Sequence, residues 1–497
     1  MSDFEKYLEK INAVHGLISA LGLLNWDQET MMPSKAVLCR SRCNAVLSGL
    51  VHEIMTSPDF GELLERLSDQ ELSFDQTVAV RETKRDRDRA VKVPRKLVEE
   101  LAMATTAANQ TWVQARRENN WSLFAPDLQK IVELRKQQAE AIGYDEEPYD
   151  ALLTEYEPGE STSNLVEQFS SLRDKLVPLL DKIRAKGSVD YDKLLQGNFE
   201  PALQQTMCIN LLECIGFDFS GGRLDNSAHP FTAEIGCNTD VRLTVAYHRD
   251  NLGAALYAAI HEGGHGLYEQ GLPSELMGTP LSESVSLGLH ESQSRLWENM
   301  VGRSKPFSVH LHKELSGLFP AEFENTSTED LYRAVNVVKQ SPIRIEADEV
   351  TYNLHIILRM ELERALIQGD IDVADLPDQW NESMRKYLGI TPADNSQGVL
   401  QDIHWSAGAF GYFPTYTLGN LYSAQFMSAA ERALPELNSQ IERGELLPLL
   451  HWMRENIHQH GRRYSAGELC ERATGSPLAI DPFVNYLESK YTELYSL

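Results

Sequence analysis

Apolar residues recur at helical spacing along most of the chain. Leu, Val, Ile and Ala recur at intervals of three and four between charged residues, which gives a helix one apolar face. The pattern predicts helices over residues 97–117, 127–142, 163–186, 354–368 and 425–443. The alternating charges of residues 84–89 are typical of a helix face in solvent. We therefore expect a mostly α protein.

One segment departs from this spacing. Residues 230–247 alternate β-branched and polar side chains on either side of Gly-Cys-Asn-Thr-Asp, which is typical of a β-hairpin. We expect a small antiparallel sheet at this point. No linker or internal repeat divides the 497 residues, and a hydrophobic fraction of 42% is enough for a large core. We expect residues 1–497 to form one domain, in which two helical halves flank a cleft.

Charge and cysteine content exclude several classes of protein. Acidic residues number 73 and basic ones 46, which gives a net charge of −27. This field repels polyphosphate and anionic headgroups, so neither nucleic-acid nor membrane binding is expected. The six cysteines form no C-x-x-C pair and are expected to be buried thiols in a reducing compartment. With no signal-like apolar segment at the N-terminus, the sequence favours a cytoplasmic enzyme.

The segment His261-Glu262-Gly263-Gly264-His265 carries the strongest chemical signal. We expect its helix to begin after Asp250 or Asn251 and to end at Gly271 and Pro273. Residues four apart on a helix share a face, so the imidazoles of His261 and His265 can bind one zinc ion.

The residues between the two histidines fit a catalytic role for that ion. Glu262 is rotated by about 100° from His261, so it can reach a zinc-activated water and act as a general base. Gly263 and Gly264 each weaken a helix by roughly 1 kcal/mol, which indicates that a substrate or a packed neighbour comes close to the backbone there. An ordinary helix with two surface histidines is the alternative, but the apolar flanks of the motif argue against it.

A catalytic zinc ion needs a third protein ligand and an open fourth position. Glu269 is on the same helix, and we expect it to be rotated away from the site. Glu283 and Glu291 belong to the next predicted helical segment, residues 281–299. Spacing and the polar cluster around Glu291 favour it over Glu283, although either residue could instead pair with Arg295.

Further segments of the chain resemble the carboxypeptidase Taq family of metallocarboxypeptidases. The resemblance rests on His261 to His265, on His290-Glu291-Ser292-Gln293, and on segments spread in order over the chain. The latter are Trp26-Asp27-Gln28, Tyr149-Asp150-Ala151-Leu152-Leu153, His229-Pro230-Phe231, Asp240-Val241-Arg242-Leu243-Thr244, Ile343-Arg344-Ile345-Glu346-Ala347-Asp348 and Gly398-Val399-Leu400-Gln401-Asp402-Ile403-His404-Trp405.

This resemblance implies a fold, an activity and a set of ligands. The fold is a large helical body with a deep central groove, similar to the angiotensin-converting-enzyme and neurolysin group, assembled as a homodimer. The activity is removal of C-terminal residues from peptides, with broad specificity. The implied cofactor is one zinc ion per chain, with cobalt as a substitute. The implied ligands are His261, His265 and Glu291, and the implied base is Glu262.

Recognition of a peptide's free C-terminus calls for a planar guanidinium. Arg344 is the first candidate, with an ion pair to Asp348 as the structural alternative, and Asp348 itself is a second substrate-side candidate. Arg242, in the predicted hairpin, either contacts substrate or braces the sheet. His229 either lines the groove or is a core residue. The hairpin suggests that a peptide adds beside it as an extended strand.

The tetrahedral intermediate of peptide hydrolysis needs hydrogen-bond donors. His404, Tyr412 and Tyr416 lie on a Gly-rich, aromatic stretch that is similar to the histidine-and-tyrosine segment of the related peptidases. We expect His404 and Tyr412 to supply these donors, with Tyr416 as a close rival and aromatic core packing as the alternative for either tyrosine.

Two other functions stay open at this point. One is a zinc oligopeptidase that cuts internal bonds, which would need no anchor for a carboxylate. The other is a non-catalytic helical scaffold with a zinc ion, although structural zinc sites usually use cysteine and none lies near His261 or Glu291. An aminopeptidase is disfavoured by the absence of a G-x-M-E-N segment.

Overall fold

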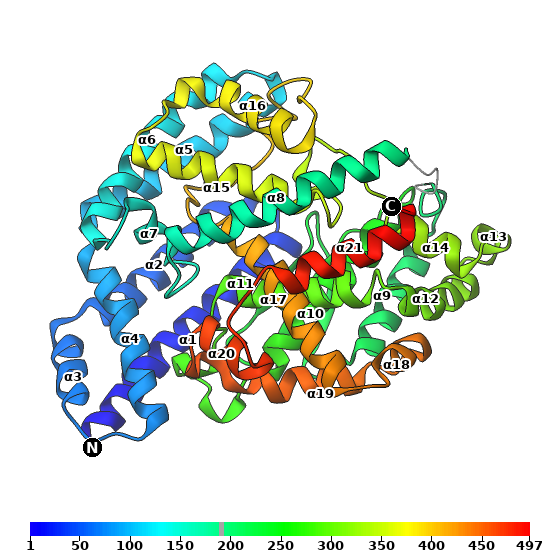
Figure 1. Cartoon of the computed structure of the whole chain (residues 1–497). Helices are drawn as coiled ribbons and strands as arrows, with labels where there is room; N and C mark the ends of the chain where they lie inside the picture. The colour runs from blue at the N-terminus through cyan, green and yellow to red at the C-terminus, as the bar shows by residue number, and fades with distance from the viewer. Residues whose placement is uncertain (188–192) are drawn as a thin grey trace.

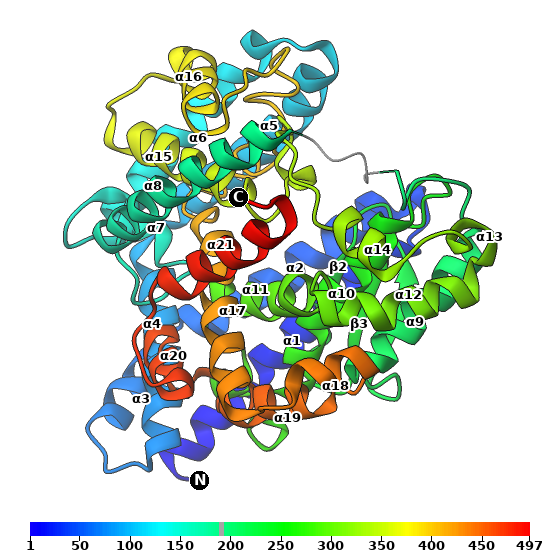
Figure 2. The same ribbon diagram turned by 45° about the vertical axis from the view of Figure 1, so that its right-hand side comes forward.

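The fold is mostly helical, as the apolar spacing predicts (Figures 1 and 2). The structure is a computed structural model that describes residues 1–187 and 193–497. The first half contains α1 (Asp3–Thr30), α2 (Val37–Thr56), α3 (Pro58–Ser68), α4 (Phe74–Lys92), α5 (Arg95–Glu118), α6 (Trp121–Ile142), α7 (Pro148–Leu153), α8 (Thr162–Lys186) and α9 (Pro201–Ile215). The second contains α10 (Leu252–Gly271), α11 (Leu287–Arg295), α12 (Lys305–Leu318), α13 (Pro320–Phe323), α14 (Thr328–Ala334), α15 (Tyr352–Gln368), α16 (Leu376–Leu388), α17 (Pro414–Ala433), α18 (Leu437–Arg443), α19 (Leu447–Asn456), α20 (Ala466–Thr474) and α21 (Asp481–Tyr495).

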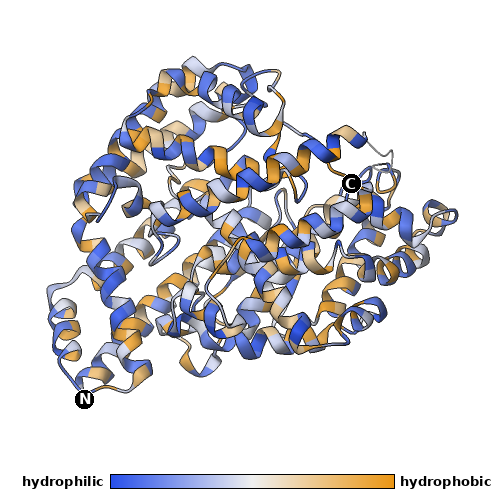
Figure 3. Ribbon diagram, in the orientation of Figure 1, coloured by the Kyte–Doolittle hydropathy of each residue, from blue (hydrophilic) through white to orange (hydrophobic). Residues whose placement is uncertain are grey.

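Three helices form the centre of the molecule. In both views α10, α11 and α17 lie between α5, α6, α15 and α16 at the top and α12 and α13 at the right, with α18 below them (Figures 1 and 2). Helix α11 packs closely against both α10 and α17. Individual helices carry both apolar and polar residues (Figure 3), and the buried apolar side chains form a large continuous core. The central helices are therefore held from several sides, which suits elements that carry a site.

The predicted hairpin is present as β2 (Phe231–Glu234) and β3 (Val241–Val245), which pair antiparallel with Phe231 opposite Thr244. The sheet is mixed and not purely antiparallel, because β1 (Gly222–Asn226) pairs parallel with β3. β1 has no apolar alternation that could have revealed it. The sheet packs on α10 through β2 and β3, so β2 is an edge strand beside the motif helix.

Two predicted helices have different bounds. The helix predicted at 425–443 is broken between α17 and α18, since Leu434 precedes Pro435 and a residue before proline avoids the helical conformation. The segment predicted at 281–299 becomes regular helix only at Leu287, where the Ser286 side chain accepts a hydrogen bond from the backbone N–H of Leu289. It continues as a π-helix over Leu296–Val301.

The prediction of buried cysteines is wrong in part. Cys208 and Cys470 are buried, but Cys39 and Cys43 are exposed on α2 and all six thiols are free. α2 has no buried residue, which spacing alone could not show. Among the described residues, no helix is long and apolar enough to cross a membrane.

Candidate metal centre

Helix α10 begins as predicted at its cap, Asn251, whose side chain accepts a hydrogen bond from the backbone N–H of Ala254. Its later turns bring the rings of His261 and His265 to one face, with centroids 4.9 Å apart. Gly264 faces α11, where an added Cβ would lie 2.6 Å from the carbonyl oxygen of Gln293 and 2.7 Å from Cα of Ser294. The close neighbour inferred from the glycines is therefore a packed helix that carries Glu291.

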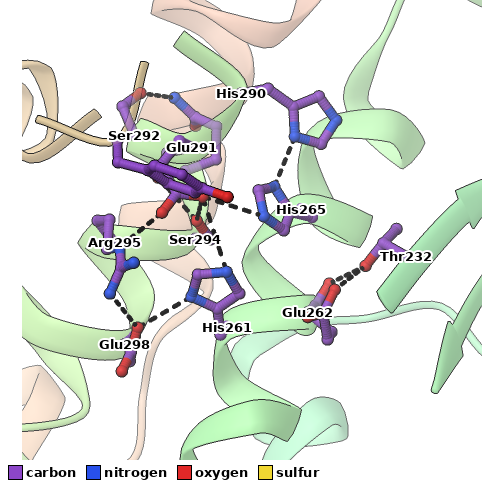
Figure 4. Close-up of polar contacts among 12 residues, drawn as sticks. Thr232, His261, Glu262, His265, His290, Glu291, Ser292, Ser294, Arg295 and Glu298 are labelled. Atoms are coloured by element: carbon purple, nitrogen blue, oxygen red, sulfur yellow. Dashed lines mark hydrogen bonds and ion pairs between the residues drawn. The ribbon is translucent and has the colours of Figure 1, made fainter. Parts of the chain in front are cut away.

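His261, His265 and Glu291 form a metal-binding group (Figure 4). One ligand atom from each lies within 4.8 Å of the others. Oε2 of Glu291 is 3.7 Å from Nε2 of His261 and 3.4 Å from Nε2 of His265. Metal bonds of about 2.0–2.1 Å at tetrahedral angles separate two ligand atoms by roughly 3.4 Å. The three residues therefore fit a metal ion with an open fourth position.

Buried partners orient these ligands. Nδ1 of His261 lies 2.9 Å from Oε2 of Glu298, which leaves Nε2 for an ion. Oε1 of Glu291 accepts a hydrogen bond from Nε of Arg295 at 2.6 Å, so Oε2 faces the histidines. Burial alone would raise the pKa of Glu291, but Arg295 and the two histidines outweigh it and hold that pKa well below its usual range. Glu291 is thus a carboxylate, the form that binds metal.

Glu262 lies beside this group and does not belong to it. Its Oε2 accepts a hydrogen bond of 2.7 Å from Oγ1 of Thr232 on the edge strand β2 (Figure 4). Burial raises the pKa of Glu262, although His261 and the Thr232 hydroxyl oppose this. A buried carboxylate with a raised pKa, next to a metal group, has the properties of a general base.

The structure brings four of the other predicted residues together. Nε2 of His404 lies 3.2 Å from the hydroxyl of Tyr416, and the rings of Tyr412 and Tyr416 have centroids 5.4 Å apart. The guanidinium of Arg344 lies 5.1 Å from the Tyr416 ring centroid. The ring centroid of Tyr416 lies 6.1 Å from that of Tyr352, and the Arg295 guanidinium, which binds Glu291, lies 4.4 Å from the Tyr352 ring centroid, so this cluster borders the metal group.

Arg344 is held differently from the predicted alternative. Its Nε donates to Oδ1 of Asp402 at 2.9 Å and its Nη1 to the hydroxyl of Tyr352 at 3.1 Å, whereas Asp348 accepts from backbone N–H groups of Val350 and Thr351. The Arg344–Asp348 ion pair is therefore absent. Asp348 is fixed in a turn before α15.

The remaining two candidates lie apart from this cluster. Arg242 makes two hydrogen bonds to Asp240 and its guanidinium lies 4.4 Å from the Trp26 ring centroid, which are contacts of a residue that braces the sheet. His229 is exposed in the connection between β1 and β2, so it is not a core residue.

Several residues of the site were not predicted as such. They are Thr232, Glu269, His290, Arg295, Glu298 and Tyr352. Glu291, Arg295 and Glu298 are spaced by four and three residues, so a common helix face was visible in the sequence. Tyr352 lies between the two parts of the site, since the Arg295 guanidinium is 4.4 Å from its ring centroid while its hydroxyl binds Arg344.

We expect Gly264→Ala to destabilise the protein by about 1–3 kcal/mol, since the new methyl group meets backbone atoms that cannot rotate away. Displacement of α11 would also weaken metal binding. Gly49→Ala is a matched control, because its Cβ meets nothing within 4 Å on helix α2 and should stabilise by about 0.5–1 kcal/mol. Chemical denaturation of both variants and the wild type measures the changes in the free energy of unfolding. Equal effects of the two substitutions would contradict the packing argument.

A His-His-Glu group on adjoining helices, with a buried glutamate between the histidines in sequence, defines a metallopeptidase. Comparison with known proteins gives the particular family. A family profile described as "Carboxypeptidase Taq (M32) metallopeptidase" matches residues 4–491. Thermostable carboxypeptidase 1 of Thermus thermophilus is 43% identical, and carboxypeptidase 1 of Bacillus subtilis 36% identical, each with 99% of both chains covered. The crystal structure of an M32 carboxypeptidase from Deinococcus radiodurans R1 superposes with a TM-score of 0.97 at 38% identity, covering all of both chains.

The chain belongs to the M32 carboxypeptidase Taq family. It is a metallocarboxypeptidase that removes C-terminal residues. This confirms the resemblance and decides against the oligopeptidase and the non-catalytic scaffold. Its metal-binding group is the one formed by His261, His265 and Glu291.

Proposed function

We propose that this metallocarboxypeptidase uses zinc, held by His261, His265 and Glu291, and that Glu262 is its general base. The observation that carries the proposal is the geometry of the three ligand atoms, with Glu262 beside them on the same helix. A divalent ion held by these three residues would supply Lewis acidity toward the scissile carbonyl and the attacking water. Glu262 takes the proton from the attacking water and passes it to the leaving amine. Cobalt, which accepts the same nitrogen and oxygen donors, would substitute for zinc.

A short unmodified peptide tests this mechanism. Zinc-loaded protein should remove residues one at a time from the C-terminus, as followed by mass spectrometry. Chelator-treated protein should leave the peptide intact, and readdition of zinc should restore cleavage. Activity that survives complete removal of the ion would overturn the proposed metal dependence.

Arg344 is the proposed anchor for the substrate's C-terminal carboxylate. Asp402 and the Tyr352 hydroxyl hold two of its nitrogens, while Nη2 makes no hydrogen bond to any residue that the structure describes. The guanidinium is thus fixed in direction beside Tyr416 and at the border of the metal group. A preorganised cation of this kind suits a carboxylate.

We expect Arg344→Ala to lower kcat/KM for a peptide with a free C-terminus by about 10- to 100-fold, the value of one charge-assisted interaction. The ratio of rates for free and amidated peptides should fall with it. Arg242→Ala is the control, since Arg242 was the rival candidate and pairs with Asp240. An unchanged ratio in Arg344→Ala would remove Arg344 from substrate recognition.

His404, Tyr412 and Tyr416 are proposed as donors to the oxyanion of the tetrahedral intermediate. The clustering of these three side chains at the border of the metal group supports the role, and the 3.2 Å contact between His404 and Tyr416 makes Tyr416 as good a candidate as Tyr412. A neutral imidazole donates one hydrogen bond and suits this role at neutral pH.

His404 also predicts a pH dependence of stability. Burial, with Arg344 and Arg359 nearby, lowers the pKa of His404 to about 4 in spite of Asp402. The unfolded chain therefore binds a proton that the folded chain does not, so stability is lost as pH falls from about 6.5 to about 4, by an amount on the order of 3 kcal/mol. Denaturation curves recorded between pH about 6.5 and about 4 should therefore show a smaller loss of unfolding free energy for His404→Gln than for the wild type. An equal loss of unfolding free energy in the wild type and in His404→Gln over this pH range would contradict the assignment to His404.

Other aspects of the proposal rest on composition and on the resemblance to the family. They are broad specificity for C-terminal residues, action of residues 1–497 as one catalytic domain with a central groove, a cytoplasmic location and a homodimer. The exposed apolar side chains of α2 support self-association, since Val37, Leu38 and Val46 are each more than half exposed, at 56%, 65% and 63%.

A further inference from the structure

We propose that His290 and Glu269 form a relay of hydrogen bonds that fixes the tautomer and ring orientation of the metal ligand His265. The two residues are positioning residues, because they act on the ion only through His265. The proposal rests on the metal centre described above. It adds a role for two side chains that the chemistry of peptide hydrolysis does not itself require.

The relay consists of two short contacts in series. Nδ1 of His265 lies 2.5 Å from Nδ1 of His290, the contact drawn as a dashed line in Figure 4. Nε2 of His290 lies 2.6 Å from Oε1 of Glu269. The side chains of the three residues are only 15%, 17% and 12% exposed, so water competes little for these bonds. His265 and Glu269 are one turn apart on α10, whereas His290 comes from α11.

The order of protons along the relay follows from the donors and acceptors. A carboxylate oxygen only accepts, so Nε2 of His290 carries the hydrogen that Glu269 receives. In a neutral His290 the other nitrogen, Nδ1, is then an acceptor. It can be satisfied only by a hydrogen on Nδ1 of His265. That tautomer leaves the lone pair of His265 Nε2 unprotonated and directed at Glu291, as a metal ligand requires.

The other histidine ligand has a simpler arrangement. Nδ1 of His261 contacts the carboxylate of Glu298 directly. The Nδ1 side of each histidine ligand is therefore linked to a carboxylate. At His261 the link to Glu298 is direct, whereas at His265 the imidazole of His290 lies between the ligand and Glu269. This intermediate group joins α10 to α11, so the same contact that orients His265 also holds the helix that carries Glu291. The relay should therefore affect metal affinity more than one isolated hydrogen bond would.

The alternative is that His290 merely fills space between the rings of His265 and Tyr268, whose centroids lie 4.5 and 5.3 Å from its own. Two substitutions of nearly equal shape separate these roles. His290→Asn places an amide oxygen where Nδ1 was and can still accept from His265, whereas His290→Leu cannot. A packing role predicts that the two variants bind metal alike or that Leu is the better replacement.

The measurement is the zinc dissociation constant of the loaded protein in competition with a chromophoric chelator. We expect His290→Leu to weaken zinc binding by about 10- to 100-fold, the usual effect of losing the group behind a metal-bound histidine, and His290→Asn to recover most of that loss. At the other end of the relay, Glu269→Leu should weaken zinc binding more than Glu269→Gln, because the glutamine oxygen can still accept the hydrogen bond from His290. Gln270→Ala is the control, since that side chain binds the backbone of Asp218 and should leave the affinity unchanged.

Each outcome is decisive. Equal zinc affinities for the Leu and Asn variants of folded protein would overturn the relay. If His290→Leu does not fold, by circular dichroism and thermal unfolding, the Glu269 pair decides in the same way. His265→Ala distinguishes a failure of the metal centre from a failure of the relay, since zinc binding that survives this change would refute His265 as a ligand. In zinc-loaded wild-type protein with labelled histidine, the Nδ1 proton of His265 should give a downfield resonance that His290→Leu lacks.

Discussion

Glu262→Gln is expected to lower kcat by about 10²- to 10⁴-fold without loss of the bound metal. The amide cannot take a proton from water, which removes the contribution of a general base. Metal content should be unchanged because Glu262 is not one of the three ligands, and the amide oxygen can still accept the hydrogen bond from Thr232. Steady-state kinetics on a short peptide, with metal analysis of the same samples, measures both effects.

A matched comparison makes this result specific. Thr232→Ser retains the hydroxyl that binds Glu262 and should keep most of the activity. If Glu262→Gln retained activity within tenfold of the wild type while carrying a full complement of metal, Glu262 would not be the base. Loss of metal along with activity would instead mean that Glu262 contributes to metal binding.

Glu291→Gln is expected to weaken metal binding by more than the roughly 10- to 100-fold typical of residues behind the ligands, with a parallel loss of activity at limiting zinc. The substitution removes the anionic ligand. It also leaves the Arg295 guanidinium with Glu298 as its remaining carboxylate partner. Chelator competition on the zinc-loaded protein gives the change in affinity.

Glu283→Gln provides the control for this substitution. Glu283 was the rival ligand in the sequence, but in the structure it pairs with Arg462 at 2.9 Å. Its variant should bind zinc as the wild type does. A larger effect at position 283 than at 291 would reverse the assignment of the third ligand.

The metal-binding group and the position of Glu262 beside it were predictable because their geometry is local. Within one helix, a spacing of four residues fixes the face on which His261 and His265 lie, whatever the rest of the fold does. Glu291 required more, since it lies on a second helix. The polar cluster around it and the distance along the chain favoured it over Glu283, and the packing of Gly264 against α11 shows how the two helices approach.

The partners of Arg344 were not predictable in this way. The i+4 spacing to Asp348 suggested an ion pair, but only Arg344–Glu346 form a short 3-10 turn and Ala347 is extended. The rule for helical neighbours therefore does not apply, and Asp402 takes the place of Asp348. A long-range partner of this kind depends on tertiary packing, which one sequence does not encode in any short pattern.

The same limit applies to Glu298, Glu269 and β1. The expectation that Glu269 is rotated away from the site is wrong, since its Oε1 lies 2.6 Å from Nε2 of His290, which in turn contacts His265. Helical spacing shows which residues share a face, but it does not show which histidine a carboxylate contacts. β1 lacks apolar alternation because it is a short edge strand whose side chains are largely polar, so its parallel pairing with β3 was not foreseen.

The ion's ligands come from two helices, α10 and α11, that meet at a backbone contact without intervening side chains. A bound ion is therefore a reversible cross-link between segments separated by a long turn. Since the unfolded chain lacks this group, occupancy adds to the free energy of unfolding as the logarithm of free metal over its dissociation constant, about 4 kcal/mol at a thousandfold excess. The supply of metal thus affects the fraction of folded protein as well as the rate of catalysis.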